Sequence, residues 1–298
     1  MVRIKTIDTR IRQLIIDDAR SCWVVQDPKT VIIDSGFPAD RHNLLSGLEQ
    51  MSLRPADIDY VALTHLHFDH AGGAGYLARE NPRLKVFIHA KGVRHLIDPT
   101  RLTESVKRAW GERFHLIGSP WPVADRQVRT IGTGDTIDLG RSRLEVYNTP
   151  GHSKHHVIFF DPEAESVFSG DAMGSLYPGL PNFVLSPPAD YNKELAKSSI
   201  DLIRALNPKQ INFTHCGPYP IAGKAGIFES LKTQHDLWNR KVAEIITENN
   251  GLSDAAIFEK FIDKLPELKN YPQQFFSFGL SVSGIKLYLK RKMTSEQI

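Results

Sequence analysis

The residues best suited to chemistry lie in one short segment. Residues 64–73 read Thr-His-Leu-His-Phe-Asp-His-Ala-Gly-Gly and directly follow the apolar run 60–63. Imidazole and carboxylate groups together form the ligand set of zinc and similar divalent metals. In an extended chain His65 and His67 point the same way, while Asp69 and His70 follow on the turn. One segment can therefore supply ligands to two neighbouring metal ions.

Three more candidate ligands each follow a short apolar run elsewhere in the chain. They are His152, Asp171 and His215, after the runs 144–147, 166–168 and 210–212. Small residues beside each ligand let the backbone approach closely, and strand ends hold a site rigidly. Four strand ends meeting at one sheet edge would form a metal-lined cleft. These additional ligands favour a metal site over a chance cluster of surface histidines.

The elements that must position these residues alternate between strand-like and helix-like patterns. In the first half we expect strands near 12–17, 21–27, 30–34, 59–64 and 85–88, with helices near 40–51 and from Ala71. In the second half we expect strands near 128–138, 143–149, 156–161, 165–169 and 209–214, with a helix near 191–206. Three further helices are expected near 226–248, 253–265 and 275–292. Such a mixture fits two sheets packed face to face with helices outside.

Five motifs in this order resemble the metallo-β-lactamase superfamily, and within it the hydrolases that include glyoxalase II and the zinc lactonases. They are Val-Ile-Ile-Asp-Ser-Gly at 31–36, the His-rich segment, Thr-Pro-Gly-His-Ser at 149–153, Ser-Gly-Asp at 169–171 and Thr-His at 214–215. The resemblance covers about residues 10–220 and implies an α/β fold, the αββα sandwich. We predict a catalytic domain at 1–222 and a C-terminal helical extension at 223–298. By analogy with glyoxalase II, this extension covers the cleft or mediates homodimerisation.

The resemblance also implies a role for each candidate residue. His65, His67 and His152 resemble the ligands of the first metal, Asp69, His70 and His215 those of the second, and Asp171 the carboxylate that bridges them. Asp34 and His156 match positions behind the ligands that brace them through hydrogen bonds. Relatives carry glycine where this chain has His155, and we expect that side chain to be exposed.

This resemblance implies a dinuclear metal-dependent hydrolase that cleaves an ester, lactone or thioester. Two divalent ions about 3.5 to 4 Å apart can hold a bridging hydroxide and polarise the bond that it attacks. We expect zinc, with manganese or iron as alternatives. Asp69 is the expected proton handler, because it can bind metal and accept a hydrogen bond from the hydroxide. Phosphodiesterase and β-lactamase activities fit the motifs less well.

Two alternatives come from other functional classes. One is a mononuclear iron dioxygenase acting on persulfides, with His65, His152 and Asp171 as its ligands. Against it, such relatives replace the histidine at 156 and carry an Arg/Cys-rich loop that this chain lacks. The other is a regulatory or binding protein that retains the metal site. Candidates at all the ligand positions argue against it.

Two loops are expected to choose the substrate. Residues 99–122 include a predicted helix at 103–114, and residues 172–190 are rich in proline. Loops of this kind beside an active site commonly carry binding residues. The candidate pocket residues are Trp110, Phe114, Met173, Tyr177 and Phe183. If they line the cleft, the substrate is a small molecule with an apolar part; the alternative is that they only pack the loops down.

Composition and charge exclude several other classes. A chain of 298 residues with 41% hydrophobic and 24% charged residues can bury a sizeable core. The sequence has no run of about 18 apolar residues that would predict a membrane span, and its N-terminus lacks the apolar core of a signal peptide. We therefore expect a cytoplasmic protein. The net charge of +3 is small, and the basic residues at 290–292 suit a helix C-terminus better than nucleic-acid binding.

The two cysteines are too few for a disulfide framework. Cys22 lies in an apolar strand and is expected in the core. Cys216 follows the candidate ligand His215, and we interpret it as a small buried residue rather than an additional ligand.

Overall fold

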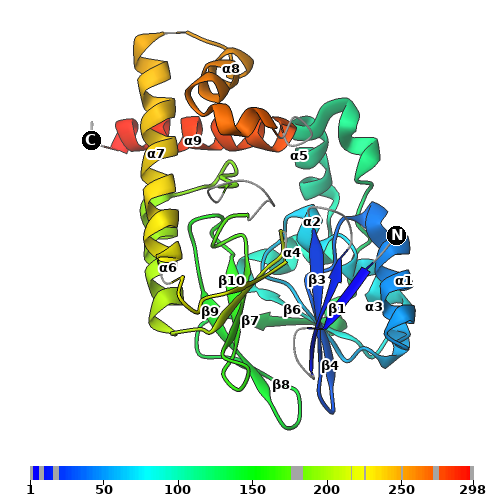
Figure 1. Cartoon of the computed structure of the whole chain (residues 1–298). Coiled ribbons are helices and arrows are strands. Elements are labelled where there is room, and N and C mark those ends of the chain that lie inside the picture. Colours follow the sequence, from blue (N-terminus) through cyan, green and yellow to red (C-terminus); the bar gives the residue numbers. More distant parts are fainter. Residues whose placement is uncertain are drawn as a thin grey trace.

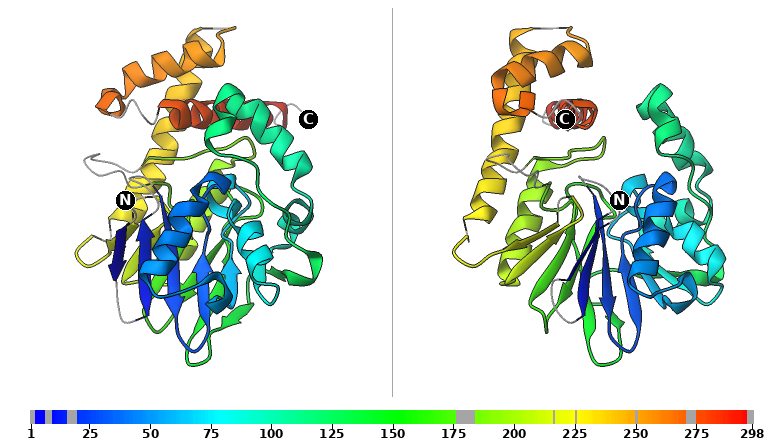
Figure 2. Two further views of the ribbon diagram at one scale, coloured as in Figure 1. Left: turned by 90° about the vertical axis from the view of Figure 1, so that its right-hand side faces the viewer. Right: turned by 45° about the vertical axis from the view of Figure 1, so that its right-hand side comes forward.

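The computed structural model describes residues 3–6, 10–15, 20–175, 184–215, 217–224, 226–249, 251–270 and 275–295. In these residues two β-sheets pack face to face, and helices cover the outer face of each sheet (Figures 1 and 2). The structure thus confirms the predicted αββα sandwich. All the candidate ligands that follow strands lie toward one edge of it.

The first sheet has seven strands in sequence order. They are β1 (Arg3–Thr6), β2 (Ile11–Ile15), β3 (Ser21–Gln26), β4 (Thr30–Ile33), β5 (Tyr60–Ala62), β6 (Lys85–His89) and β7 (Val128–Ile131). Strands β1 to β4 pair antiparallel, and β4 to β7 pair parallel. Because β4 and β5 run parallel, the segments that follow them leave the sheet at the same edge.

The second sheet has six strands in the order β13-β12-β11-β10-β9-β8. They are β8 (Thr136–Asp138), β9 (Arg143–Asn148), β10 (Val157–Asp161), β11 (Ser166–Gly170), β12 (Gln210–Phe213) and β13 (Gly217–Pro220). Within this sheet only the β11–β12 pair is parallel among the described strands. The ends of β9, β11 and β12 carry the second half of the candidate ligands.

Helices surround this sandwich. The α-helices are α1 (Arg41–Gln50), α2 (Phe68–Ala71), α3 (Ala74–Glu80), α4 (Val93–Ile97), α5 (Thr100–Trp110), α6 (Lys193–Ala205), α7 (Ile227–Glu248), α8 (Asp254–Lys264) and α9 (Phe275–Ser295). Short 3-10 helices are η1 (Pro38–Asp40), η2 (Pro55–Asp57), η3 (Ala90–Gly92), η4 (Gly111–Leu116), η5 (Asp125–Gln127) and η6 (Pro266–Asn270). No helix among the described residues is long and apolar enough to cross a membrane.

The buried apolar residues divide into layers that match this architecture. One cluster lies between the sheets and includes Trp23, Phe159 and Phe168. A second joins the first sheet to α1 and α3, and it contains Cys22, as predicted. A third joins the second sheet to α6 and the start of α7. A rigid support of this kind fixes the strand ends on which the candidate ligands stand.

The C-terminal helices have a hydrophobic cluster of their own. Trp238, Val242 and Phe261 belong to it, together with residues of α9 and of the segment 184–196. Helix α9 crosses above the sandwich and reaches α5 at its N-terminal end (Figure 1). The predicted helical extension is therefore present, and the domain boundary at 222 stays a prediction.

Two element predictions were wrong. The strand expected at 128–138 is two strands in different sheets, because the turn at Gly132–Asp135 carries the chain from β7 to β8. The helix expected from Ala71 begins at Phe68 as α2, is interrupted at Gly72 and Gly73, and resumes as α3. In each case glycines break a pattern that periodicity alone reads as continuous.

Candidate metal centre

The His-rich segment is packed tightly against the loop that follows β4. A Cβ atom on Gly72 would lie 2.3 Å from Pro38 Cδ, and one on Gly73 would lie 2.4 Å from Ser35 O. Only glycine allows this approach, which also ends α2 after a single turn. His67 precedes α2 in an extended conformation, whereas Asp69 and His70 lie within it. The segment therefore changes direction between its first two histidines and its last two ligands.

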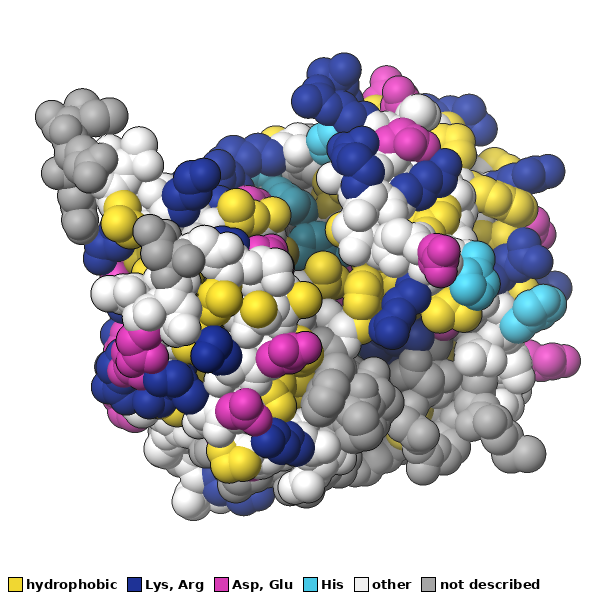
Figure 3. Space-filling view, turned by 90° about the horizontal axis from the view of Figure 1, so that it is seen from above, with side chains coloured by type: hydrophobic (Ala, Val, Ile, Leu, Met, Phe, Trp, Pro, Cys, Tyr) yellow, Lys and Arg dark blue, Asp and Glu magenta, His cyan; other side chains and the backbone are white. Residues whose placement is uncertain are grey.

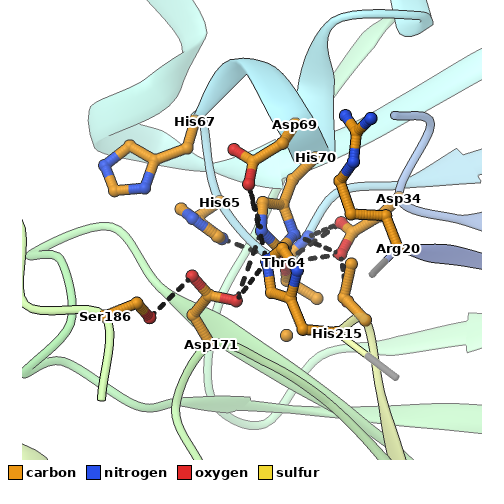
Figure 4. A network of polar contacts seen from close by, with 12 residues as sticks. Arg20, Asp34, Thr64, His65, His67, Asp69, His70, Asp171, Ser186 and His215 are labelled. Carbon is orange, nitrogen blue, oxygen red and sulfur yellow. Dashed lines mark hydrogen bonds and ion pairs between the residues drawn. The ribbon is translucent and has the colours of Figure 1, made fainter. Parts of the chain in front are cut away.

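Asp34 connects the ends of three strands beneath this segment. Its carboxylate accepts hydrogen bonds from the backbone N–H of Thr64 at 2.9 Å, from Thr64 Oγ1 at 3.0 Å and from Thr214 Oγ1 at 3.0 Å. Its Oδ2 also lies 2.7 Å from His70 Nδ1. The residue is fully buried, with a positive φ of 57°. Asp34 thus ties β4 to the segments after β5 and β12 and fixes the His70 ring (Figure 4).

The candidate ligands gather in two adjacent groups. The first contains His65, His67, His152 and Asp171, and the second contains Asp69, His70 and His215, with the ligand atoms of each group within 4.8 Å of one another. Sequence reasoning predicted all of these residues. In the first group, His152 Nε2 lies 2.9 Å from His67 Nδ1. In the second, His215 Nε2 lies 3.4 Å from Asp69 Oδ2.

The carboxylate of Asp171 lies between the two groups. Its Oδ1 is 3.3 Å from His70 Nε2 and 3.4 Å from His215 Nε2, while its Oδ2 is 3.5 Å from His152 Nε2. One oxygen therefore faces each group (Figure 4). This is the placement that a carboxylate shared by two cations requires.

Several of these atoms are buried without a hydrogen-bond partner among the described residues. They include His65 Nε2, His70 Nε2 and Asp171 Oδ1. A buried polar atom without a partner is costly and uncommon in folded proteins. Two of them, His70 Nε2 and Asp171 Oδ1, lie 3.3 Å apart where the two groups meet. Nitrogen and oxygen donors left in this state fit divalent metal ions.

The electrostatics of the centre also favour cations. Burial lowers the pKa of His65 well below its ordinary value, and it lowers the pKa of His152 to about 3. Burial would raise the pKa of Asp171, but the neighbouring His70 holds it well below its usual range. Neutral histidines and ionised carboxylates are the forms that bind metal.

The surroundings of His70 also favour positive charge. Burial would lower its pKa, but the carboxylates of Asp171, Asp34 and Asp69 raise it well above the ordinary value. The site therefore favours positive charge at this position. A divalent cation satisfies that preference more fully than a proton does.

His156 lies behind the first group and orients its carboxylate. Its Nε2 accepts a hydrogen bond from the backbone N–H of Asp171 at 3.1 Å, and its Nδ1 lies 2.9 Å from Thr149 Oγ1. Gly170, at a φ of +47°, allows this contact, since a Cβ there would lie 2.8 Å from His156 Nε2. His156 therefore helps to hold the turn that carries Asp171.

The prediction for His155 was wrong. The side chain is half-buried, its ring centroid lies 6.3 Å from that of His65, and burial lowers its pKa to about 4. The neighbouring Lys154 takes the exposed position of this turn instead. The direction in which a turn presents its side chains cannot be read from residue type.

The predicted pocket residues have different fates. Trp110 is half-buried and contacts Phe37 and Phe276 with ring centroids 5.5 and 4.8 Å away. Phe114 is half-buried beside Lys107. Met173 is fully buried among Ile200, Phe213 and other core residues, so its assignment to the pocket was wrong. Tyr177, Phe183 and Cys216 lie outside the described residues.

Viewed from above, histidine side chains lie at the bottom of a hollow, and Lys and Arg side chains occur around it (Figure 3).

Sequence reasoning missed Phe276, which brings α9 to the side of Trp110. It also missed Ser186, whose hydroxyl donates to Asp171 Oδ2 at 3.1 Å. Neither residue has a motif or a periodicity that marks it, because each contact joins segments far apart in the sequence.

Comparisons with known proteins agree with this geometry. The family model of the metallo-β-lactamase superfamily matches residues 15–215, which is more than half of the chain. A solved metallo-β-lactamase family protein from Thermus thermophilus has a similar fold, with a TM-score of 0.63 and 20% identity, covering 92% of this chain and 89% of that one.

The matches to curated relatives cover only part of each protein. A metallo-β-lactamase fold-containing protein of Sulfurisphaera tokodaii is 29% identical over 54% of this chain and 61% of its own length. A hydroxyacylglutathione hydrolase of Idiomarina loihiensis is 24% identical over 58% of this chain and 56% of its own length. An acyl-coenzyme A thioesterase of Gallus gallus is 32% identical over 40% and 43%. The matches thus span less than two thirds of these relatives.

Proposed function

We propose that this chain, which belongs to the metallo-β-lactamase superfamily, hydrolyses an ester, lactone or thioester at a centre of two divalent metal ions. The observation that carries this proposal is the pair of ligand groups on either side of Asp171. A group of three histidines and a carboxylate beside a group of two histidines and a carboxylate offers two neighbouring cation sites. Zinc suits this nitrogen-rich set best, with manganese or iron as alternatives.

Each residue has a distinct task in the proposed reaction. His65, His67 and His152 would hold the first ion, Asp69, His70 and His215 the second, and Asp171 both. When bound, such ions acidify water and polarise the bond to be cleaved. Asp34 and His156 keep His70 and Asp171 in place through the hydrogen bonds described above.

Asp69 is the residue that handles the proton. Its side chain is 23% exposed, whereas that of Asp171 is 4% exposed, so Asp69 faces the cleft more openly. Burial would raise its pKa, but His70 and His215 lower it, so the carboxylate is ionised at neutral pH. It can therefore accept a hydrogen bond from the attacking water and then carry its proton toward the leaving group.

The substrate class rests on two kinds of support. Relatives named as a hydroxyacylglutathione hydrolase and an acyl-coenzyme A thioesterase favour a hydrolase of ester-like bonds. Trp110 and Phe276, which contact each other between α5 and α9, favour a small molecule with an apolar part. Homodimer formation and a cytoplasmic location remain predictions from the sequence.

A substrate panel tests this proposal. Tag-free protein loaded with zinc is offered a p-nitrophenyl ester, an aliphatic lactone, an acyl thioester, a phosphodiester and a β-lactam. We expect turnover of at least one of the first three, with loss of that turnover in Asp69→Asn. Turnover confined to the phosphodiester or the β-lactam would overturn the ester-like assignment. Oxygen uptake by a separate iron-loaded sample with a persulfide would favour the iron dioxygenase instead.

A further inference from the structure

Residues 184–191 form a strap between the candidate metal centre and the C-terminal helices. At its start, Val184 and Ser175 exchange backbone hydrogen bonds of 2.8 and 2.9 Å. At its end, the backbone N–H of Asn192 donates to Gly151 O at 2.8 Å, beside the candidate ligand His152. The strap is thus anchored to the turns that carry Asp171 and His152.

Ser186, in the middle of the strap, contacts two candidate ligands of the first metal. Its hydroxyl donates to Asp171 Oδ2 at 3.1 Å, and the same oxygen lies 3.5 Å from His152 Nδ1 (Figure 4). His152 Nδ1 is on the outer side of its ring, because His152 Nε2 faces His67. Asp171 Oδ2 is the oxygen that faces the first group, so Ser186 shares this oxygen with the first metal position and can orient both side chains.

Helix α9 holds the opposite side of the strap. Arg291 donates to Ala189 O at 2.7 Å and to Tyr191 O at 2.8 Å. A Cβ on Gly284 would lie 2.0 Å from Pro187 O, so glycine lets the helix lie directly on the strap backbone. The position of Ser186 is consequently set by α9 as well as by the sandwich.

Helix α7 fixes the end of the strap. The hydroxyl of Tyr191 lies 2.7 Å from His235 Nδ1 and accepts a hydrogen bond from Asn239 Nδ2 at 3.1 Å. All three residues are buried. Helices α7 and α9 therefore both contact the strap, and the Ser186 hydroxyl of this strap contacts the candidate ligands.

We propose that Ser186 is a positioning residue that aligns Asp171 and His152 in the metal centre. Helix α9 holds Ser186 in place through the hydrogen bonds of Arg291 to the strap backbone. A carboxylate shared by two ions must present both oxygens at fixed angles, and a hydrogen bond to one of its oxygens helps to set those angles. The C-terminal helices thereby take part in metal binding although they contribute no ligand among the described residues. The inference rests on the proposed metal centre.

Metal titration tests this proposal. Metal-free protein is titrated with zinc in competition with a chromophoric chelator, for the wild type, Ser186→Ala, Ser186→Thr, Arg291→Ala and two controls. The controls are Ser198→Ala, an exposed helical serine whose hydroxyl donates to Glu194 O, and Lys290→Ala, an exposed neighbour of Arg291. Urea unfolding of each metal-free variant separates metal affinity from stability.

We expect Ser186→Ala to weaken zinc binding by roughly tenfold to a hundredfold, the usual effect of losing a partner behind a ligand. Ser186→Thr should restore the affinity, since it retains the hydroxyl. Arg291→Ala should weaken binding in the same direction but less, and both controls should match the wild type. The unfolding midpoints of the metal-free Ser186 variants should be equal.

Wild-type affinity in Ser186→Ala would overturn the role of Ser186, and equal affinity in Arg291→Ala and Lys290→Ala would overturn the role of α9. In either case a wild type that binds two ions leaves the proposed function intact. A wild type that binds neither zinc nor, in the same titration, manganese or iron(II) would overturn the proposed function and this inference together.

Discussion

Two buried polar clusters lie close together in this protein, one with several histidines and one around His235, and they differ in how their histidine nitrogens are paired. In the candidate metal centre, His65 Nε2 and His70 Nε2 have no hydrogen-bond partner among the described residues. Beneath the C-terminal helices, by contrast, His235 Nδ1 meets the hydroxyl of Tyr191 at 2.7 Å, and Asn239 donates to the same hydroxyl. The histidine nitrogens distinguish the two clusters. Those of the first cluster would be satisfied by a bound cation, whereas in the second cluster His235 Nδ1 is paired and the atom Asn239 Oδ1 is unpaired.

The difference separates a ligand-binding cluster from a structural one. Residues of the metal centre should therefore govern activity and metal content, whereas residues of the His235 cluster should govern stability. The expected effects below follow this division, beginning with the largest.

Substitution at Asp69 should have the largest effect on activity. Asp69→Asn retains the shape of the side chain but removes the ionised group that accepts the proton, so kcat should fall by about a hundredfold or more. Steady-state kinetics on the best substrate of the panel would measure the loss. Asp125→Asn, at an exposed position in η5, is the control. Near-wild-type kcat in Asp69→Asn with full metal content would contradict the assignment.

Asp34 belongs to the metal centre, yet its carboxylate is fully paired, so it sharpens the comparison. Asp34→Ala leaves buried donors on Thr64, Thr214 and His70 without an acceptor and should lower the free energy of unfolding by about 3 kcal/mol. Urea unfolding of the metal-free protein measures this. Asp34→Asn should lose less, because asparagine tolerates the positive φ of this position. Equal losses in the two variants would show that the carboxylate, not the backbone conformation, matters.

His235 should affect the pH dependence of stability. Burial lowers its pKa to about 3, so it is neutral when folded but becomes protonated below about pH 6.5 when unfolded. Its contribution is therefore fully present above about pH 6.5 and is lost as the pH falls. Between pH 7.5 and 5 the metal-free wild type should lose about 2 kcal/mol more stability than His235→Phe. Chemical unfolding at the two pH values checks this, and parallel losses would place His235 in a polar environment.

Trp110 should have the smallest effect. Trp110→Ala removes an aromatic contact with Phe276 that we predict to line the cleft, and we expect KM to rise by roughly fivefold with little change in kcat, as for a lost apolar contact. Trp121→Ala, which alters a half-buried indole packed on Tyr76 and Arg79, is the matched control. A fall in kcat without a change in KM would instead place Trp110 among the residues that support the chemistry.

The sequence was sufficient to predict the sandwich, the C-terminal helices and the residues of the two ligand groups. Strand ends followed by histidine or aspartate are local signals, and their order along the chain resembles one family. The burial of His155, the core position of Met173 and the split between β7 and β8 depend on turns whose direction residue types do not specify. The contacts of Ser186 and Phe276 depend on where α9 packs, and no local sequence pattern specifies contacts between segments so far apart in the chain.

The central claim is that this chain binds two divalent ions at the groups joined by Asp171. Metal content per chain, measured by elemental analysis on protein purified without chelator or histidine tag, tests it most directly. The account predicts about two equivalents in the wild type and a clear loss in His215→Ala, which removes a candidate ligand of the second ion. One equivalent of iron alone, or no metal after incubation with zinc, would contradict it.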